Sequence, residues 1–248
     1  MNRSWWAFCA VAVLLGGPQV RGADEPQAIV ARGIAALGGE ARLAKAKALH
    51  WKTDGKLTLD GNDNSFKIET TTQGLDHLRS EVRGEFNGNE IHVTTVVDGK
   101  KGWRTFPETN ALDEDGLDNE KRVLYLQVVP ITLLPLLDKG FKLEAAGEEK
   151  VDDKPAQALK VTAPDGKTFR LMFDKATGLP VRTVATVVGI GGDDYEQTAT
   201  YSNFKEMGGI RKATTVEMLR DGNPLLRTTV TEFQPLEAAP AGTFAEPK

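Results

Sequence analysis

The chain has 248 residues, of which 40% are hydrophobic and 27% charged, so it can bury a core beneath a hydrated surface and is not a disordered chain. Its formal net charge is −4, and it becomes −6 when the two arginines of residues 1–22 are removed. An acidic chain of this kind does not favour nucleic acid as a partner.

The N-terminus, MNRSWWAFCAVAVLLGGPQVRGADE, predicts a secretory signal peptide. Arg3 provides a positive start, residues 5–15 form an apolar run, and small residues precede a cleavage site after Gly22, with Ala23 as the near alternative. The run is too short to span a membrane, which makes an uncleaved anchor the less favoured alternative. The only cysteine, Cys9, lies inside this peptide, so the mature chain has no disulfide and no thiolate site.

The mature chain, residues 23–248, is expected to form one domain that begins with two helices. Residues 26–38 predict an amphipathic helix, because Pro26 suits the first helical position and apolar residues recur at helical spacing before two glycines. A second short helix is predicted at residues 40–48.

From residue 49 onward, apolar and polar residues alternate, which is the period of a half-buried strand. The segments 49–59, 66–72 and 78–83 follow this pattern. Turn sequences such as Asp-Gly-Asn, Asn-Gly-Asn and Pro-Asp-Gly separate these segments and later ones. The pattern predicts a mainly β (α+β) fold with a single antiparallel sheet of about eleven strands.

One long interruption, DEDGLDNEKRVLYLQVVPITLLPLLDK at residues 113–139, starts acidic and is densely apolar over residues 123–137. The acidic start favours a helix N-terminus, whereas Pro130 and Pro135 prevent one straight helix. We expect a helix to about Val128, followed by a kinked second piece, with residues 123–137 lying across the concave face of the sheet. The segment is too short and too broken to span a membrane.

The stretch LMFDKATGLPVR at residues 171–182 raises the question of whether Asp174 is a nucleophile. Asp174 and Lys175 are soon followed by Thr-Gly, as in enzymes that phosphorylate an aspartate, but Ala176 splits the run. Asp, Thr and Gly between two alternating segments are typical turn residues, since their side chains bond to the local backbone. We therefore predict a hairpin turn without phosphate chemistry.

No other motif in the chain carries chemistry. His50, His77 and His92 stand at outward strand positions without metal-ligand spacing. The patterns of calcium loops, dinucleotide-binding turns and nucleophile elbows are all broken. We predict no catalytic residue, no metal site, no cofactor and no enzymatic activity.

Four stretches in order carry a resemblance that covers nearly the whole mature chain: ALGGEARLAKAKALHWKTDGKLTL, VVDGKKGWRTFP, KVTAPDGKTFRLMFDKATGLPVRT and YSNFKEMGGIRKATTVEM. Together with the signal peptide and the apolar helical segment, they resemble the LolA-like family of outer-membrane lipoprotein-sorting proteins. The resemblance implies a periplasmic protein with a curved antiparallel half-barrel, closed by helices over an apolar cavity. In the best-known members the cavity holds lipid acyl chains, and other relatives sense lipid or mislocalised outer-membrane proteins.

The expected cavity lining combines apolar strand residues of one parity with leucines of the helical lid. These residues are Trp51, Leu57, Phe66, Ile68, Leu78, Val82, Leu133, Leu134 and Leu137. Thr53, Gly55 and Thr70 on the same faces are small, so we expect space for lipid to remain. The same residues would also face inward if the sheet packed on its helices as a solid core.

Two functions follow from this reading. The first is binding of lipid or lipoprotein acyl chains in the periplasm, after export through the general route and without a membrane span in the mature chain. The second is an envelope interaction or sensor module without cargo, whose partner would be an envelope protein; a hydrolase is least favoured. Sorting members are also described as using an inward arginine to gate the lid, and Arg79, Arg83 and Arg104 lie in strands without matching it residue by residue.

Overall fold

The computed structural model describes residues 25–59, 61–86, 88–189 and 192–248. The predicted signal peptide and its cleavage site lie outside these residues. None of the described helices is both long and apolar enough to cross a membrane.

Two helices precede the sheet. Helix α1 (Pro26–Leu37) agrees with its prediction, with proline in the first turn and Gly38 at the C-cap. Helix α2 (Glu40–Leu43) is a single turn, so the prediction of a helix to residue 48 was wrong. Strand β1 already begins at Ala48, which pairs with Gln73 on one side and with Leu236 on the other. Pairing on both sides of the strand outweighs the helix propensity of this alanine- and lysine-rich stretch.

The described strands form one antiparallel sheet in the order β6-β5-β4-β3-β2-β1-β13-β12-β11-β10-β9-β8-β7. Its strands are β1 (Ala48–Leu59), β2 (Asn62–Gln73), β3 (His77–Phe86), β4 (Asn89–Asp98), β5 (Lys101–Thr105), β6 (Thr109–Ala111), β7 (Lys142–Val151), β8 (Lys154–Thr162), β9 (Thr168–Asp174), β10 (Pro180–Val188), β11 (Asp194–Met207), β12 (Ile210–Arg220) and β13 (Asn223–Leu236). The curved antiparallel sheet is confirmed, with thirteen strands instead of about eleven. One strand, β6, is only three residues long, which is too short to show an alternating pattern.

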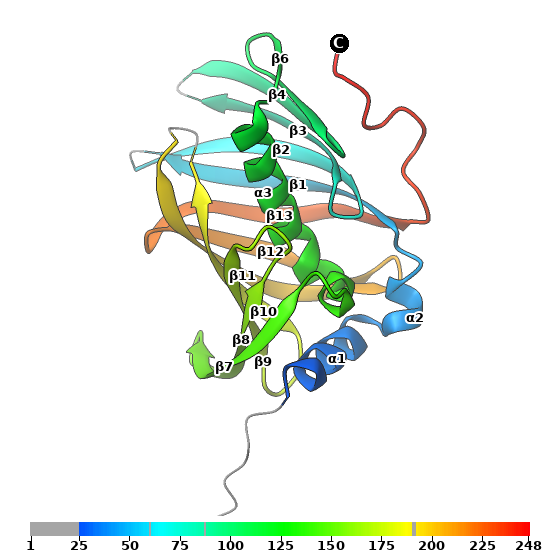
Figure 1. Ribbon diagram of the computed structural model, residues 1–248. Coiled ribbons are helices and arrows are strands. Elements are labelled where there is room, and N and C mark those ends of the chain that lie inside the picture. The colour runs from blue at the N-terminus through cyan, green and yellow to red at the C-terminus, as the bar shows by residue number, and fades with distance from the viewer. Residues whose placement is uncertain (1–24, 60, 87, 190–191) are drawn as a thin grey trace, which may run out of the picture.

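Helix α3 (Glu114–Thr132) lies across the concave face of the sheet, as Figure 1 shows. Its N-cap residue Asp113 accepts a hydrogen bond from the Gly116 amide at 2.8 Å, which agrees with the acidic helix start in the sequence. The helix continues through Pro130, so the predicted end near Val128 was wrong. Pro130 lies in the last turn, where its missing N–H removes one helical hydrogen bond. The helix tolerates this loss because it ends two residues later, at Thr132.

The break comes at Leu133, whose backbone is left-handed with φ of 59°. A leucine in this conformation costs about 1–2 kcal/mol. The side chain of Leu133 is fully buried, which contributes about 1.5–3 kcal/mol and offsets that cost. The reversal starts the 3₁₀-helix η1 (Leu134–Leu137), which passes close to the segment that follows α2.

One hydrophobic core joins α1, α3 and the concave face of the sheet. Its residues come from strands on both halves of the sheet, from Trp51 on β1 to Leu171 on β9. A smaller cluster of Val151, Ala156, Ala158 and Met172 belongs to strands β7–β9. The helix therefore fills much of the space that the curved sheet encloses.

Candidate functional site

An apolar pocket of about 320 Å³ remains at the end of the concave face where α3 stops. Its walls come from α2, the start of β1, the turn between β2 and β3, the last turns of α3, and η1. The lining residues are Leu43, Ala44, Ala46, Lys47, Leu49, Thr72, Gly74, Leu75, Val128, Thr132, Leu134 and Pro135. Most of these are aliphatic, and the lysine is exposed, so the walls suit a hydrocarbon chain.

The strand residues predicted to line a cavity do share one face of the sheet. Antiparallel partners point to the same side, and Thr53 pairs with Ile68, which in turn pairs with Val82. Trp51 and Leu78 lie on this face and belong to the hydrophobic core that α3 covers. The strand residues that were predicted to line a cavity therefore point to the inner face of the sheet.

The nine predicted residues are not brought together around one space. Trp51, Leu78 and Leu133 are buried in the core, and Leu134 lines the apolar pocket. Leu57, Ile68 and Val82 are half-buried on the other half of the inner face, and Leu137 is 52% exposed. That these residues hold a ligand stays a prediction.

Phe66 fills part of the space that small residues were expected to leave. Its ring lies over Gly55, where an added Cβ would come within 2.3 Å of the ring. Any side chain at residue 55 would therefore require the Phe66 ring to move. The expected room on this part of the face is therefore reduced.

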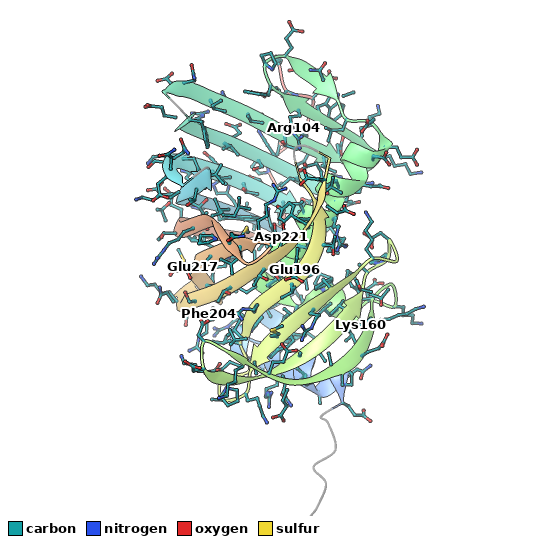
Figure 2. All side chains as sticks on the ribbon, turned by 90° about the vertical axis from the view of Figure 1, so that its left-hand side faces the viewer. Arg104, Lys160, Glu196, Phe204, Glu217 and Asp221 are labelled. Atoms are coloured by element: carbon teal, nitrogen blue, oxygen red, sulfur yellow. The ribbon has the colours of Figure 1, made fainter. Side chains whose placement is uncertain are left out.

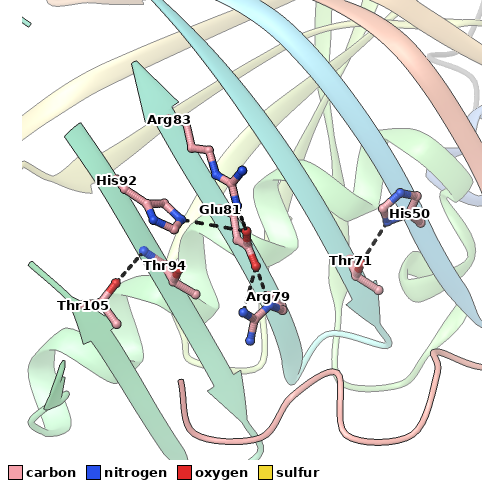
Figure 3. A network of polar contacts seen from close by, with 8 residues as sticks. All are labelled: His50, Thr71, Arg79, Glu81, Arg83, His92, Thr94 and Thr105. Carbon is pink, nitrogen blue, oxygen red and sulfur yellow. Dashed lines mark hydrogen bonds and ion pairs between the residues drawn. The ribbon is translucent and has the colours of Figure 1, made fainter. Parts of the chain in front are cut away.

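A larger, open hollow of about 1340 Å³ lies on strands β1–β4 and β13. Charged residues such as Lys56, Lys67, Arg83 and Glu90 line it, and ion pairs join Lys56 to Asp63 at 3.5 Å. Figure 3 shows Arg83 on the side of the sheet turned away from α3. Because acyl chains avoid charged walls, we place the candidate site in the smaller apolar pocket.

The polar network on this outer face centres on Glu81 (Figure 3). Arg79 donates two hydrogen bonds to its carboxylate at 2.7 and 2.9 Å, and Arg83 donates a third at 3.0 Å. Burial raises the pKa of Glu81, but the two arginines outweigh burial and lower it. Both arginines are thus bound on the outer face and do not contact the helical lid.

Arg104 is the one of the three considered arginines that reaches the lid. It lies on β5, in the upper half of Figure 2, and pairs with Glu120 of α3. Its Nε also donates to the Thr95 hydroxyl at 3.3 Å. Burial raises the pKa of Glu120, and the positive charge of Arg104 opposes that rise without cancelling it.

Arg122 of α3 is a second arginine at the lid, and sequence reasoning missed it. Its side chain is buried, and it donates to the carbonyl oxygens of Thr186 at 2.7 Å and Thr168 at 3.1 Å. It also donates to the hydroxyl of Tyr125, which in turn donates to Asp165 at 3.0 Å. In the sequence, Arg122 stands beside other charged residues at the polar start of a helix, and no local signal separates it from a solvated residue.

Asp174 is a turn residue, as the sequence predicted. Its Oδ1 accepts hydrogen bonds from the backbone amides of Ala176 at 3.1 Å and Thr177 at 2.7 Å, and from the Thr177 hydroxyl at 2.7 Å. Burial raises the pKa of Asp174, but these hydrogen bonds together outweigh burial and lower it. The carboxylate is occupied by the turn and is not presented to a substrate.

Comparison with known proteins gives a fold and no sequence match. No family model and no curated protein matches the sequence. A LolA superfamily protein from Nitrosomonas europaea is 13% identical, with 89% of this chain and 97% of that chain covered and a TM-score of 0.56. A putative outer membrane lipoprotein-sorting protein domain from Vibrio parahaemolyticus is 10% identical, with 87% and 97% covered and a TM-score of 0.53.

A third solved structure, a DUF1329 family protein from Desulfovibrio piger, is 12% identical, with 88% of this chain and 94% of that chain covered and a TM-score of 0.51. All three similarities extend over most of both chains. At such low identity they show the fold alone. The chain has a LolA-like fold, which agrees with the resemblance in its sequence.

Proposed function

We propose that this protein is a periplasmic binding protein that holds an acyl chain of a lipid or lipoprotein in the apolar pocket at the end of α3. The observation that carries the proposal is the pocket itself: about 320 Å³ with mainly aliphatic walls. Its LolA-like fold supports the proposal, since one protein of similar structure is described as a putative lipoprotein-sorting domain. The predicted signal peptide supports export to the compartment where such cargo occurs.

The pocket selects a hydrocarbon chain by its chemistry and its size. Thr72 and Thr132 are buried, and Lys47 is the one charged residue in the lining. A charged headgroup would find little hydrogen bonding inside, so it would have to stay at the mouth. The volume is near the lower end of the roughly 300–1,000 Å³ of ligand sites, which fits part of one acyl chain.

An envelope interaction or sensor module without cargo is the second candidate. The observation in its favour is that α3 covers much of the concave face, where Trp51, Leu78 and Leu133 pack in one core. In this case the apolar pocket would be a packing defect, and an envelope protein would be the partner.

Native mass spectrometry of protein purified gently from its envelope distinguishes the two. We expect a mass above the bare mature chain, corresponding to a diacyl lipid or fatty acid, and binding of a fluorescent fatty-acid probe. Leu134→Asp should weaken probe binding about tenfold or more, because it places an unpaired charge in the pocket wall.

The matched control is Leu226→Asp, since Leu226 is also half-buried but lies outside the pocket, next to Leu57. We expect this variant to bind the probe as the unchanged protein does. If only Leu226→Asp weakens binding, the acyl chain occupies the other half of the inner face. A bare chain mass together with no probe binding would replace the binding function with the interaction module.

A further inference from the structure

Two large apolar side chains are exposed in the part of the chain that the structure describes. They are Phe106, which is 55% exposed, and Leu137, which is 52% exposed. Phe106 lies between β5 and β6 near the start of α3, and Leu137 ends η1 just beyond the end of α3. A helix of 19 residues is about 28 Å long, so the two residues lie near opposite ends of α3.

Two segments that meet at the apolar pocket are rich in positive charge, and one of them carries Leu137. The pocket brings Ala46 and Lys47 together with Leu134 and Pro135, so residues 40–47 lie beside the start of η1. We use the word rim for residues 40–47 together with residues 133–142, which contain η1 and the segment that follows it. These two segments carry five cationic and two anionic side chains, although the whole chain has a net charge of −4. The cations are Arg42, Lys45, Lys47, Lys139 and Lys142, and all five are exposed.

None of the five cations forms an ion pair or side-chain hydrogen bond with a described residue. Several lysines elsewhere on the sheet are paired, such as Lys52 with Glu232 at 3.0 Å. Of the two anions at the rim, Asp138 accepts a hydrogen bond from the Gly140 amide at 2.7 Å. Asp76 and Glu237 line a neighbouring hollow, which shares Lys47 with the pocket. The rim keeps an excess of free positive charge beside an exposed leucine.

The opposite end of α3 has the reverse charge. Residues 106–118 contain five acidic side chains and no basic one. These acids are Glu108, Asp113, Glu114, Asp115 and Asp118, and all five are exposed. The two segments at the ends of α3 therefore carry opposite net charge, and an anionic surface would attract the first and repel the second.

We infer that the pocket mouth docks on a membrane surface that contains anionic phospholipid, with Leu137 inserted among the acyl chains and the five cations against the headgroups. Membrane surfaces select this combination, because apolar insertion and attraction of lysines to anionic lipid add to each other. The inference rests on the proposed function in one respect: docking in this orientation would bring the pocket directly to lipid.

The test is co-sedimentation of the mature protein with vesicles of phosphatidylcholine alone and with vesicles that also contain phosphatidylglycerol. We expect binding only to the second kind, and we expect it to weaken as salt is added. Leu137→Asp should reduce binding by at least about tenfold through lost insertion. Lys45→Gln should reduce binding about fivefold through the loss of one charge.

Phe106→Asp is the matched control, since it removes an equally exposed apolar side chain from the acidic end and should leave vesicle binding unchanged. Leu137 and Lys45 lie outside the pocket lining, so binding of the fatty-acid probe should be unchanged in their variants. Because Lys45 is exposed, Lys45→Gln gives a folded test even if Leu137→Asp does not fold.

Equal binding to both kinds of vesicle would overturn the inference, as would full binding by Leu137→Asp and Lys45→Gln. Loss of binding in Phe106→Asp to the same extent would also overturn it. If vesicle binding follows the expected pattern but no acyl chain is found in the pocket, the docking surface stands and the proposed function fails. If the probe binds but the vesicles do not, the proposed function stands and the inference of membrane docking fails. The partner at the pocket mouth would then be a protein.

Discussion

Replacing the buried guanidinium of Arg122 should loosen α3 from the sheet. Thr168 and Thr186 lie directly beyond Phe169 and Ala185, which form the last pair of the β9–β10 ladder, so their carbonyl oxygens lie where the two strands separate. Arg122 donates to both oxygens, at 3.1 and 2.7 Å, and so supplies hydrogen bonds that the ladder no longer provides. Arg122→Met keeps much of the length of the side chain and removes these bonds.

The size of the effect follows from the bonds and from the buried charge. Hydrogen bonds to a charged donor contribute about 1.5–3 kcal/mol each, and Arg122 makes three, the third to Tyr125. The substitution also removes the cost of burying a positive charge, which cancels part of this loss. We expect the free energy of unfolding to fall by about 2–4 kcal/mol, within the roughly 5–15 kcal/mol that a domain has.

Urea unfolding of the mature protein measures the change, followed by tryptophan fluorescence and circular dichroism. Tyr125→Phe should cost about 1 kcal/mol, and the double variant should cost less than the sum because the two side chains share a bond. Arg83→Met is the control away from α3; because Arg83 is exposed and Glu81 keeps its hydrogen bonds from Arg79, this substitution should cost no more than about 1 kcal/mol. A cost below about 1 kcal/mol for Arg122→Met would refute the role of this residue in holding α3.

Two further predictions concern a turn and a buried charge. Asp174→Ala should lower the free energy of unfolding at pH 7 by about 1–3 kcal/mol, because the hydrogen bonds from Ala176 and Thr177 are lost, and should leave probe binding unchanged. Because the pKa of Asp174 is lowered in the folded state, this stabilisation should be present above about pH 4 and be lost on acidification. Urea unfolding at several pH values measures both effects. Lys212 is buried without an ion pair among the described residues, and burial lowers its pKa to about 8. Between pH 8 and the ordinary value of 10.5 the unfolded chain binds more protons than the folded chain, so the free energy of unfolding should rise with pH in this interval. Lys212→Met should abolish that rise and stabilise the protein at pH 7 by up to about 3 kcal/mol, and an unchanged pH dependence in this variant would contradict the assignment.

Much of the fold can be read from the sequence because its signals are local. Alternation of apolar and polar residues fixes which side of each strand faces inward, and the turn sequences fix where the strands end. The same local chemistry placed Asp174 in a turn, since the hydrogen-bond donors to its carboxylate lie within three residues. The acidic residues at the start of α3 likewise predicted a helix N-terminus.

The tertiary structure decided what covers the inner face. Alternation shows that Trp51, Phe66 and Ile68 point inward, but it cannot show whether a helix, another side chain or a ligand meets them there. That depends on the path of α3, which continues through Pro130 and turns at Leu133. The pocket is the space left where the helix ends, so its walls come from segments far apart in the chain.

Arg122 illustrates most clearly a feature that only the tertiary structure decides. Its carbonyl partners lie 46 and 64 residues further along the chain, at the separated ends of two strands. A buried arginine and a solvated arginine have the same local sequence in a charged helix, because burial is set by what packs against the helix. The sequence alone determines the sheet, its inner face and the helices near it. The tertiary structure determines which arginine holds the lid and where an apolar space remains, since both depend on contacts between residues distant in sequence.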